Sequence, residues 1–204
     1  MLIDICGVSQ RPKPALFVDL VGTLIHGPEK SGKFPNRVGD IVMYEGVAER
    51  LLAYKTAGWS LICVSNQGGV ACGYLTVEDV RLIFEEVDLA VGQLFDVMIA
   101  DVTHPQAVDP PKRHYLWRKP SPSMAARAIT RLLNIYPRFT TPPWKCLMVG
   151  DQTDDMEFAI QAGMGYLQAD VWRHLNLEHH PLTVDNARVL TPERFEVRRQ
   201  LAWA

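Results

Sequence analysis

Short apolar runs alternate with segments of helical period along this chain, and that alternation limits the folds it can adopt. The apolar runs predict buried strands at Ala15–Leu20, Trp59–Val64, Phe95–Ala100, Cys146–Val149 and Tyr166–Ala169. Strands that are apolar throughout, instead of alternating with polar residues, are typical of parallel sheets buried on both faces. The pattern therefore predicts an α/β fold in which helices cover both faces of a mainly parallel sheet.

The predicted helices lie between these strands, and two of them carry terminal signals. They span Val47–Lys55, Val77–Leu94, a segment from Ser121 or Ser123 to Leu133, and Asp154–Ala162. Thr76 is suited to cap the second helix because Asp79 follows three residues later, and Gly163 is suited to end the last one. Each predicted strand is thus joined to the next by a helix, as parallel pairing requires.

Length and composition place the chain among globular proteins. It has 204 residues, of which 48% are apolar, and we predict one domain over 1–204, with a core of about 15–170 and a C-terminal extension of 171–204. The net charge of −2 gives no sign of a nucleic-acid or membrane surface, although it is compatible with a local basic patch. We find neither a signal peptide nor an apolar run long enough for a membrane span. Cysteines without close pairing favour the cytoplasm.

Polar side chains follow three of the predicted strands. Asp19 follows the first, Ser65 and Asn66 the second, and Asp151 the fourth. Parallel strands bring their carboxyl ends to one edge, where ligands bind. Carboxylates that meet there repel each other unless a cation lies between them, and Mg²⁺ prefers such oxygen ligands. Ser65 could hold an anion, Lys119 could add a positive charge, and Asp19 could attack phosphorus as a nucleophile.

Each of these residues taken alone has a simpler explanation. An aspartate at a strand end often caps a turn or a helix, and an isolated lysine is usually solvated. We favour function because four motifs occur in order: strand-D-x-x-G-T, strand-S-N, K-P and strand-G-D-x-x-x-D. Two long loops, Gly27–Gly39 and Thr103–Trp117, are either substrate lids or solvated surface loops.

This motif order resembles the haloacid dehalogenase (HAD) superfamily of phosphohydrolases. Within it, the chain is most similar to the small-capped group of heptose bisphosphate phosphatase, histidinol phosphatase and polynucleotide 3′-phosphatase. The similarity rests on "SLICVSNQGGVACGYLTVED", "WRKPSPSM" and "CLMVGDQTDDMEFAIQAGM", and it covers roughly Ala15 to Asp170. It implies a Rossmann-like three-layer α/β/α sandwich with a minimal cap, and it implies Mg²⁺-dependent phosphoryl transfer.

The resemblance also implies a role for each matching residue. Asp19 would be the nucleophile, Ser65 would bind the transferring phosphoryl group, and Lys119 would neutralise charge on both. Thr23, Asn66 and Arg118 would contact the substrate. The Mg²⁺ ligands would be Asp19, the backbone carbonyl of Val21, and Asp151, with Asp155 supporting the metal shell or Lys119.

Val21 departs from the family pattern, which usually has a second aspartate at this position. That aspartate protonates the leaving oxygen, and general acid–base catalysis is worth about 10²–10⁴-fold. Three explanations remain open. The leaving group needs little protonation, another residue such as His26 substitutes, or the chain binds phosphorylated ligands with little or no turnover. Other HAD branches carry tyrosine, alanine or threonine here, so Val21 alone does not make the chain inactive.

A second departure concerns the zinc site that heptose phosphatases often carry before the "RKP" motif. The corresponding positions here are Asp101, Thr103, Tyr115 and Trp117, and none of them supplies a thiolate. Zinc in structural sites prefers sulfur and nitrogen ligands, so we expect no zinc. The altered loop also makes a sugar substrate less certain than the resemblance alone would suggest.

We therefore expect a Mg²⁺-dependent phosphohydrolase or phosphotransferase that acts on a small phosphorylated molecule through an aspartyl-phosphate on Asp19. The alternative is a catalytically silent HAD domain that binds a phosphorylated ligand or a protein partner. Val21 favours the alternative, whereas the intact set of Asp19, Ser65, Lys119 and Asp151 favours the enzyme. Phosphorylation of Asp19 would distinguish the two.

Overall fold

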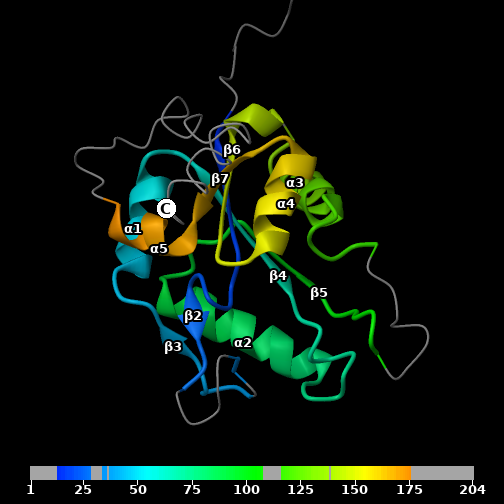
Figure 1. The fold of residues 1–204 in the computed structure, drawn as a ribbon. Helices are drawn as coiled ribbons and strands as arrows, with labels where there is room; N and C mark the ends of the chain where they lie inside the picture. The colour runs from blue at the N-terminus through cyan, green and yellow to red at the C-terminus, as the bar shows by residue number, and fades with distance from the viewer. Residues whose placement is uncertain (1–12, 29–33, 36, 108–115, 138, 176–204) are drawn as a thin grey trace, which may run out of the picture.

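A parallel β-sheet of five strands forms the centre of the molecule (Figure 1). The structure is a computed structural model that describes residues 13–28, 34–35, 37–107, 116–137 and 139–175. The strands are β1 (Ala15–Val18), β4 (Ser60–Asn66), β5 (Val97–Asp101), β6 (Cys146–Gly150) and β7 (Gly165–Gln168), in the order β5-β4-β1-β6-β7. All four neighbouring pairs are parallel, which confirms the predicted α/β class.

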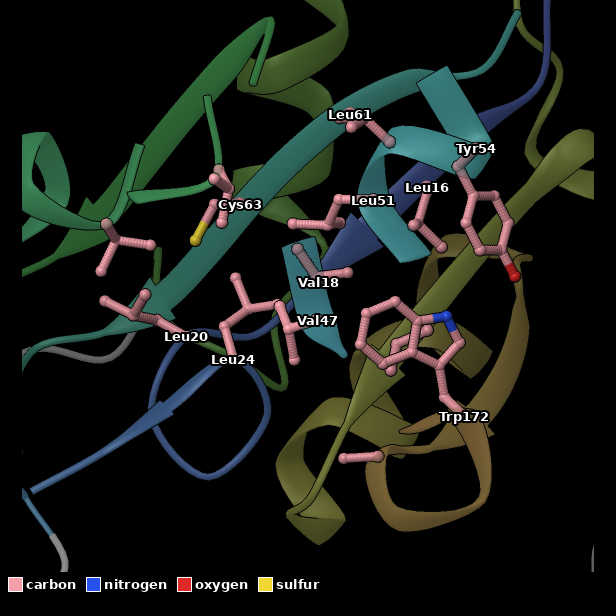
Figure 2. Close-up of a cluster of buried hydrophobic side chains, with 14 of the residues drawn as sticks. Leu16, Val18, Leu20, Leu24, Val47, Leu51, Tyr54, Leu61, Cys63 and Trp172 are labelled. Atoms are coloured by element: carbon pink, nitrogen blue, oxygen red, sulfur yellow. The ribbon is translucent and has the colours of Figure 1, made fainter. Parts of the chain in front are cut away.

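Helices cover both faces of this sheet. The cluster of buried side chains on one face draws on α1 (Val47–Thr56), α2 (Val77–Ala90) and α5 (Ala169–His174). The cluster on the other face draws on α3 (Ser123–Ile135) and α4 (Thr153–Ala162). Figure 2 shows side chains of the first cluster, with Leu51 of α1 and Trp172 of α5 gathered beside those of β1. The three-layer α/β/α sandwich is therefore confirmed.

Successive residues of β1 point to opposite faces. Leu16 and Val18 belong to the first cluster, whereas Ala15 and Phe17 belong to the second, and all four are fully buried. A continuous apolar run is what a central strand covered on both sides requires. This burial fixes the register of β1, because a shift by one residue would exchange the two faces.

Several element boundaries differ from the predicted ones. β4 runs through Ser65 and Asn66, because its parallel pairing with β5 continues to the Asn66–Asp101 pair. α2 ends at Ala90, four residues before the predicted end, and Gly92 follows with a φ of 82°. The capping box of Thr76 and Asp79 and the left-handed Gly163 after α4 are both confirmed.

A small antiparallel sheet follows β1 and was not predicted. It pairs β2 (Ile25–His26) with β3 (Val42–Met43), and strands of two residues leave no readable periodicity. The 3₁₀ turn η3 (Pro143–Lys145) and the short helix α5 were missed for the same reason. Trp172 of α5 is fully buried, so part of the predicted extension packs into the core, whereas residues 176–204 lie outside the described residues.

No helix in the described part of the chain has both the length and the apolar character needed to cross a membrane.

Candidate active site

The predicted polar residues converge at the carboxyl edge of the sheet. β1 lies between β4 and β6, so Asp19, one residue after β1, is flanked by Ser65 at the end of β4 and by Asp151 after β6. The backbone N–H of Asp19 donates to the carbonyl oxygen of Val149 at 2.9 Å, which holds the residue against β6. The nucleophile predicted from the sequence therefore stands on the central strand of the sheet.

Lys119 is the centre of a buried ion-pair network. Its Nζ lies 2.5 Å from Asp19 Oδ1 and 2.6 Å from Asp155 Oδ1, and it donates to the carbonyl oxygen of Val64 at 2.9 Å. The side chain of Lys119 is only 2% exposed and that of Asp155 only 1%. A buried ammonium with three oxygen partners has its three N–H groups satisfied. The lysine therefore holds positive charge directly beside the candidate nucleophile.

The charges in this network shift each other's ionisation. Burial raises the pKa of the Asp19 carboxyl to about 7, because desolvation disfavours its charged form and Asp155 adds repulsion, while Lys119 opposes both effects. Burial alone would lower the pKa of Lys119, but Asp19 and Asp155 together raise it above its ordinary value. The lysine is thus charged at neutral pH, and a further cation beside Asp19 would favour the carboxylate form of that residue.

Three carboxylates could hold a metal ion at this edge. Oxygen atoms of Asp19, Asp151 and Asp155 lie within 4.8 Å of one another. Gly22 makes room for this arrangement, because a β-carbon there would lie 2.3 Å from Asp151 Oδ2, and its φ of 93° favours glycine. Hard oxygen donors in this number fit Mg²⁺, which takes one or two carboxylates plus water and phosphate oxygens. The donor set therefore fits the predicted cofactor.

Asp155 has a second contact besides Lys119. Its Oδ2 accepts a hydrogen bond from the backbone N–H of Gln152 at 3.0 Å, as part of the capping box of α4. Asp155 Oδ2 thus caps the N-terminus of α4, while Asp155 Oδ1 pairs with Lys119. This geometry favours the second of the two roles predicted for Asp155, which was support of Lys119.

Ser65 and Asn66 lie at the end of β4 with different surroundings. Ser65 Oγ accepts a hydrogen bond from Gln67 Nε2 at 2.9 Å. The Asn66 amide faces the backbone of Lys119, donating to its carbonyl oxygen and accepting from its N–H, both at 2.9 Å. The Asn66 side chain therefore fixes the position of Lys119, and its predicted contact with substrate stays a prediction.

A cavity of about 550 Å³ opens over these residues. Its lining includes the predicted Asp19, Val21, Ser65, Asn66, Arg118, Lys119 and Asp155. It also includes residues from the two long loops, namely Phe34 and Pro35 from the first and His104 from the second. The described parts of both loops thus reach the site, and sequence patterns alone did not single out these three residues.

Three candidate site residues from the sequence are not among those that line the cavity, namely Asp151, Thr23 and His26. Thr23 is fully buried, and its Oγ1 has no hydrogen-bond partner among the described residues. His26 directs Nδ1 toward the carbonyl oxygen of Gly27 at 2.7 Å, and its ring packs against Tyr44 with centroids 4.9 Å apart. His26 is therefore poorly placed to replace the missing acid, and substrate contact by Thr23 stays a prediction.

Hydrogen bonds organise the loop in which the sequence predicted no zinc site. Asp101 Oδ1 accepts from the backbone N–H of Thr103 at 2.9 Å and from its hydroxyl at 2.5 Å. The carbonyl oxygen of Thr103 accepts from Arg118 Nη1 at 2.6 Å. The loop is thus tied to Arg118 without thiolates. Tyr115 lies outside the described residues, and the absence of zinc stays a prediction.

His104 is the additional polar residue that the cavity reveals. Its Nδ1 accepts from the backbone N–H of Gln106 at 3.1 Å, which leaves the proton on Nε2 when the ring is neutral. A β-carbon on Gly68 would lie 2.7 Å from His104 Cδ2, so the ring packs tightly on the loop after β4. Only the tertiary structure distinguishes this histidine from a surface one.

Comparisons with known proteins agree with the resemblance that the motifs indicate. A family model described as HAD-hydrolase-like matches residues 116–168. D-glycero-beta-D-manno-heptose-1,7-bisphosphate 7-phosphatase of Haemophilus ducreyi is 28% identical over 158 residues, which are 74% of this chain and 80% of that protein.

Two solved structures share the fold. A HAD-like phosphatase of Mesorhizobium loti has a TM-score of 0.66 and 21% identity, covering 89% of this chain and 91% of that one. The D,D-heptose 1,7-bisphosphate phosphatase of B. bronchiseptica, solved with magnesium and phosphate, has a TM-score of 0.59 and 22% identity, covering 74% and 78%. The resemblance to the HAD superfamily that the motifs predicted is thereby confirmed.

Proposed function

We propose that this protein is a Mg²⁺-dependent phosphohydrolase that acts on a small phosphorylated molecule through an aspartyl-phosphate on Asp19. The observation that carries the proposal is the buried Lys119, which joins Asp19 to Asp155 beside a cavity that Ser65 also lines. A buried lysine between two carboxylates is costly to assemble for stability alone. Beside a phosphoryl group, the same arrangement neutralises negative charge where it develops.

The residues divide the work of phosphoryl transfer. Asp19 supplies the attacking oxygen, and Lys119 orients this carboxylate and offsets charge on the phosphoryl oxygens. Ser65 Oγ donates to a phosphoryl oxygen, because Gln67 already provides the hydrogen bond that Ser65 accepts. Mg²⁺ held by Asp19, Asp151 and the carbonyl of Val21 would supply further charge neutralisation. Positioning and electrostatics account for most of the catalysis in this chemistry.

The relatives support an assignment of the reaction type more strongly than an assignment of the substrate. Their names describe phosphatases of a heptose bisphosphate, and one related structure was solved with magnesium and phosphate. The four motifs of this chain resemble those of the HAD superfamily, whereas Val21 and the loop without thiolates depart from the expected pattern. We therefore assign the reaction type from the relatives and leave phosphotransfer to an acceptor other than water as a variant of the same mechanism.

Asp19→Asn and Val21→Asp test the proposal together. The purified protein is incubated with Mg²⁺ and a panel of phosphate esters and acyl phosphates, while released phosphate and acid-stable phosphoprotein are followed. We expect Asp19→Asn to abolish both signals because it removes the nucleophile. We expect Val21→Asp to raise turnover by about 10²-fold or more for esters of basic alcohols, because it restores a proton donor. Turnover that survives in Asp19→Asn would refute the aspartyl-phosphate.

A second function is favoured by one observation, the valine in the cavity wall. In that case the protein is a silent HAD domain that binds a phosphorylated ligand or a protein partner. It would form no phosphoprotein and release no phosphate from any member of the panel, even as the Val21→Asp variant. Phosphoprotein without turnover in the natural sequence, released by Val21→Asp, would instead show an enzyme stalled at its second step.

A further inference from the structure

The turn that carries the nucleophile presents an apolar wall to the cavity. Val21 lines the cavity two residues after Asp19 and also packs against the first buried cluster. Lys119 pairs with both Asp19 and Asp155, so these three side chains are committed to the ion-pair network. The other cavity residues with a transferable proton, such as His104, belong to other elements. The substrate oxygen that Asp19 displaces from phosphorus therefore meets no proton donor among the side chains of this turn that line the cavity.

Two exposed aromatic side chains are among the residues that line the cavity. Phe34 and Tyr74 both line it and are 61% and 77% exposed, and they come from the loops after β2 and β4. Pro35 and Leu75 continue this surface. Exposed aromatic rings from two separate segments at the rim of one cavity favour a flat, apolar ligand, since planar rings gain from offset or edge contacts with them.

The apolar turn with Val21 and the aromatic lining residues favour the same kind of substrate. Phosphoryl transfer passes through a loose transition state, in which the leaving oxygen gains much of the negative charge. Because the turn of Asp19 supplies no proton donor, and general acid catalysis there would be worth about 10²–10⁴-fold, this oxygen must be weakly basic. A phenol-type oxygen on a flat ring meets both requirements, whereas a sugar hydroxyl meets neither.

We propose that the substrate class is an aryl phosphate, a phosphomonoester of an aromatic hydroxyl whose ring lies against Phe34 and Tyr74. This inference rests on the proposed function and narrows its substrate. In the first step an Asp19 carboxylate oxygen bonds to phosphorus, the bond from phosphorus to the aryl oxygen breaks, and its electron pair leaves on an aryloxide that needs no proton. In the second step a water oxygen bonds to phosphorus, the carboxylate is regenerated, and the water protons pass to phosphate and solvent.

Matched substrates separate the leaving group from the ring. Phenyl phosphate and benzyl phosphate both carry a benzene ring, but only phenyl phosphate releases a weakly basic oxygen. Cyclohexyl phosphate and glucose 6-phosphate lack both features, and acetyl phosphate has a good leaving group without a ring. The measured quantity is kcat/KM with Mg²⁺, because it reports formation of the phosphoenzyme even where the second step limits kcat.

We expect phenyl phosphate to exceed benzyl phosphate by about 10²-fold or more in kcat/KM, and Val21→Asp to reduce this ratio at least tenfold. The double variant Phe34→Ala and Tyr74→Ala should lower kcat/KM for phenyl phosphate about tenfold and leave acetyl phosphate unchanged. Trp144→Ala is the matched control, because this tryptophan is 60% exposed and is not among the cavity residues.

Other outcomes would overturn the proposal in distinguishable ways. Equal kcat/KM for phenyl and benzyl phosphate, with benzyl turnover lost in His104→Ala, would identify His104 as the acid and remove the demand for an aryl leaving group. A preference for acetyl phosphate that the rim variant does not alter would point to acyl phosphates. A preference for glucose 6-phosphate would also reject the class while retaining phosphatase activity. Absence of both phosphoprotein and released phosphate with every substrate would instead refute the proposed function itself.

Discussion

At the scale of single residues, Lys119 is the most constrained side chain of the site. Its ammonium binds two carboxylates and a backbone carbonyl, and its own peptide groups are held by the Asn66 amide. Both ends of the residue are thus fixed by different elements. Removing its charge would leave Asp19 and Asp155 facing each other in a buried site without compensation.

We expect Lys119→Met to lower the free energy of unfolding by about 3–5 kcal/mol, the usual effect of removing one partner from a buried ion pair. It should also abolish turnover, because Met keeps the length of the side chain but not its charge. Chemical denaturation measures the free energy of unfolding. Steady-state assays under conditions in which the variant is folded measure turnover.

Arg37→Met serves as the control for this substitution. Arg37 pairs with Asp40 at the surface, its side chain is 80% exposed, and its loss should change stability by about 0–1 kcal/mol. A Lys119→Met protein as stable as this control would mean that one of the buried carboxylates is neutral in the folded state.

At the scale of elements, the short helix α5 holds the turn that carries the nucleophile. Arg173 of α5 donates from Nη1 to the carbonyl oxygens of Gly22 and Thr23 at 3.0 and 2.8 Å. Its guanidinium also lies over the ring of Tyr44, 3.9 Å from the centroid, and its side chain is only 8% exposed. A segment that the sequence presented as a packing extension therefore reaches the back of the site.

We expect Arg173→Met to raise the Mg²⁺ concentration needed for half-maximal turnover at least severalfold and to lower stability by about 1.5–3 kcal/mol. The reason is that the turn with Val21 and Gly22 would lose two charge-assisted hydrogen bonds. Magnesium titrations of turnover, together with denaturation curves, separate positioning of the site from general stability.

Arg131→Met is a matched control for Arg173→Met. Arg131 is an exposed arginine that also donates to a backbone carbonyl, that of Met98, at 3.2 Å. Arg131→Met should leave the magnesium dependence of turnover unchanged. If Arg173→Met shifted only stability and not the magnesium dependence, its role would be confined to packing.

At the scale of the whole molecule, metal binding should be linked to folding. Carboxylates of Asp19, Asp151 and Asp155 come from the ends of two strands and the start of α4, and they meet only in the folded chain. A ligand that binds only the folded state stabilises it by about 2.7 kcal/mol at a concentration of a hundred times its Kd.

We therefore expect Tm to rise with increasing Mg²⁺, and Asp151→Asn to weaken this rise. Differential scanning calorimetry with and without Mg²⁺ measures the effect, and Glu157→Gln, at an exposed position of α4 that does not line the cavity, controls for the loss of one acidic charge. An equal rise in both variants would show nonspecific screening of charge and contradict the proposed metal site.

Local pattern by itself determined the strands and the main helices, and it pointed to the residues of the candidate site. Continuous apolar runs such as Ala15–Val18 and signals such as Thr76 with Asp79 act within a few residues, so they can be recognised without a structure. The motif order also selected Asp19, Ser65, Lys119 and Asp151, because chemistry restricts which residue types can serve in phosphoryl transfer.

Tertiary structure alone decided which side chains meet. The contacts of Lys119 with Asp19 and of Arg173 with Thr23 join residues 100 and 150 positions apart. The short strands β2 and β3, the turn of Asn66 toward Lys119 and the entry of His104 into the cavity depend on how the sheet and its loops pack. Such contacts leave no periodic signal, because long-range packing satisfies them rather than the preferences of neighbouring residues.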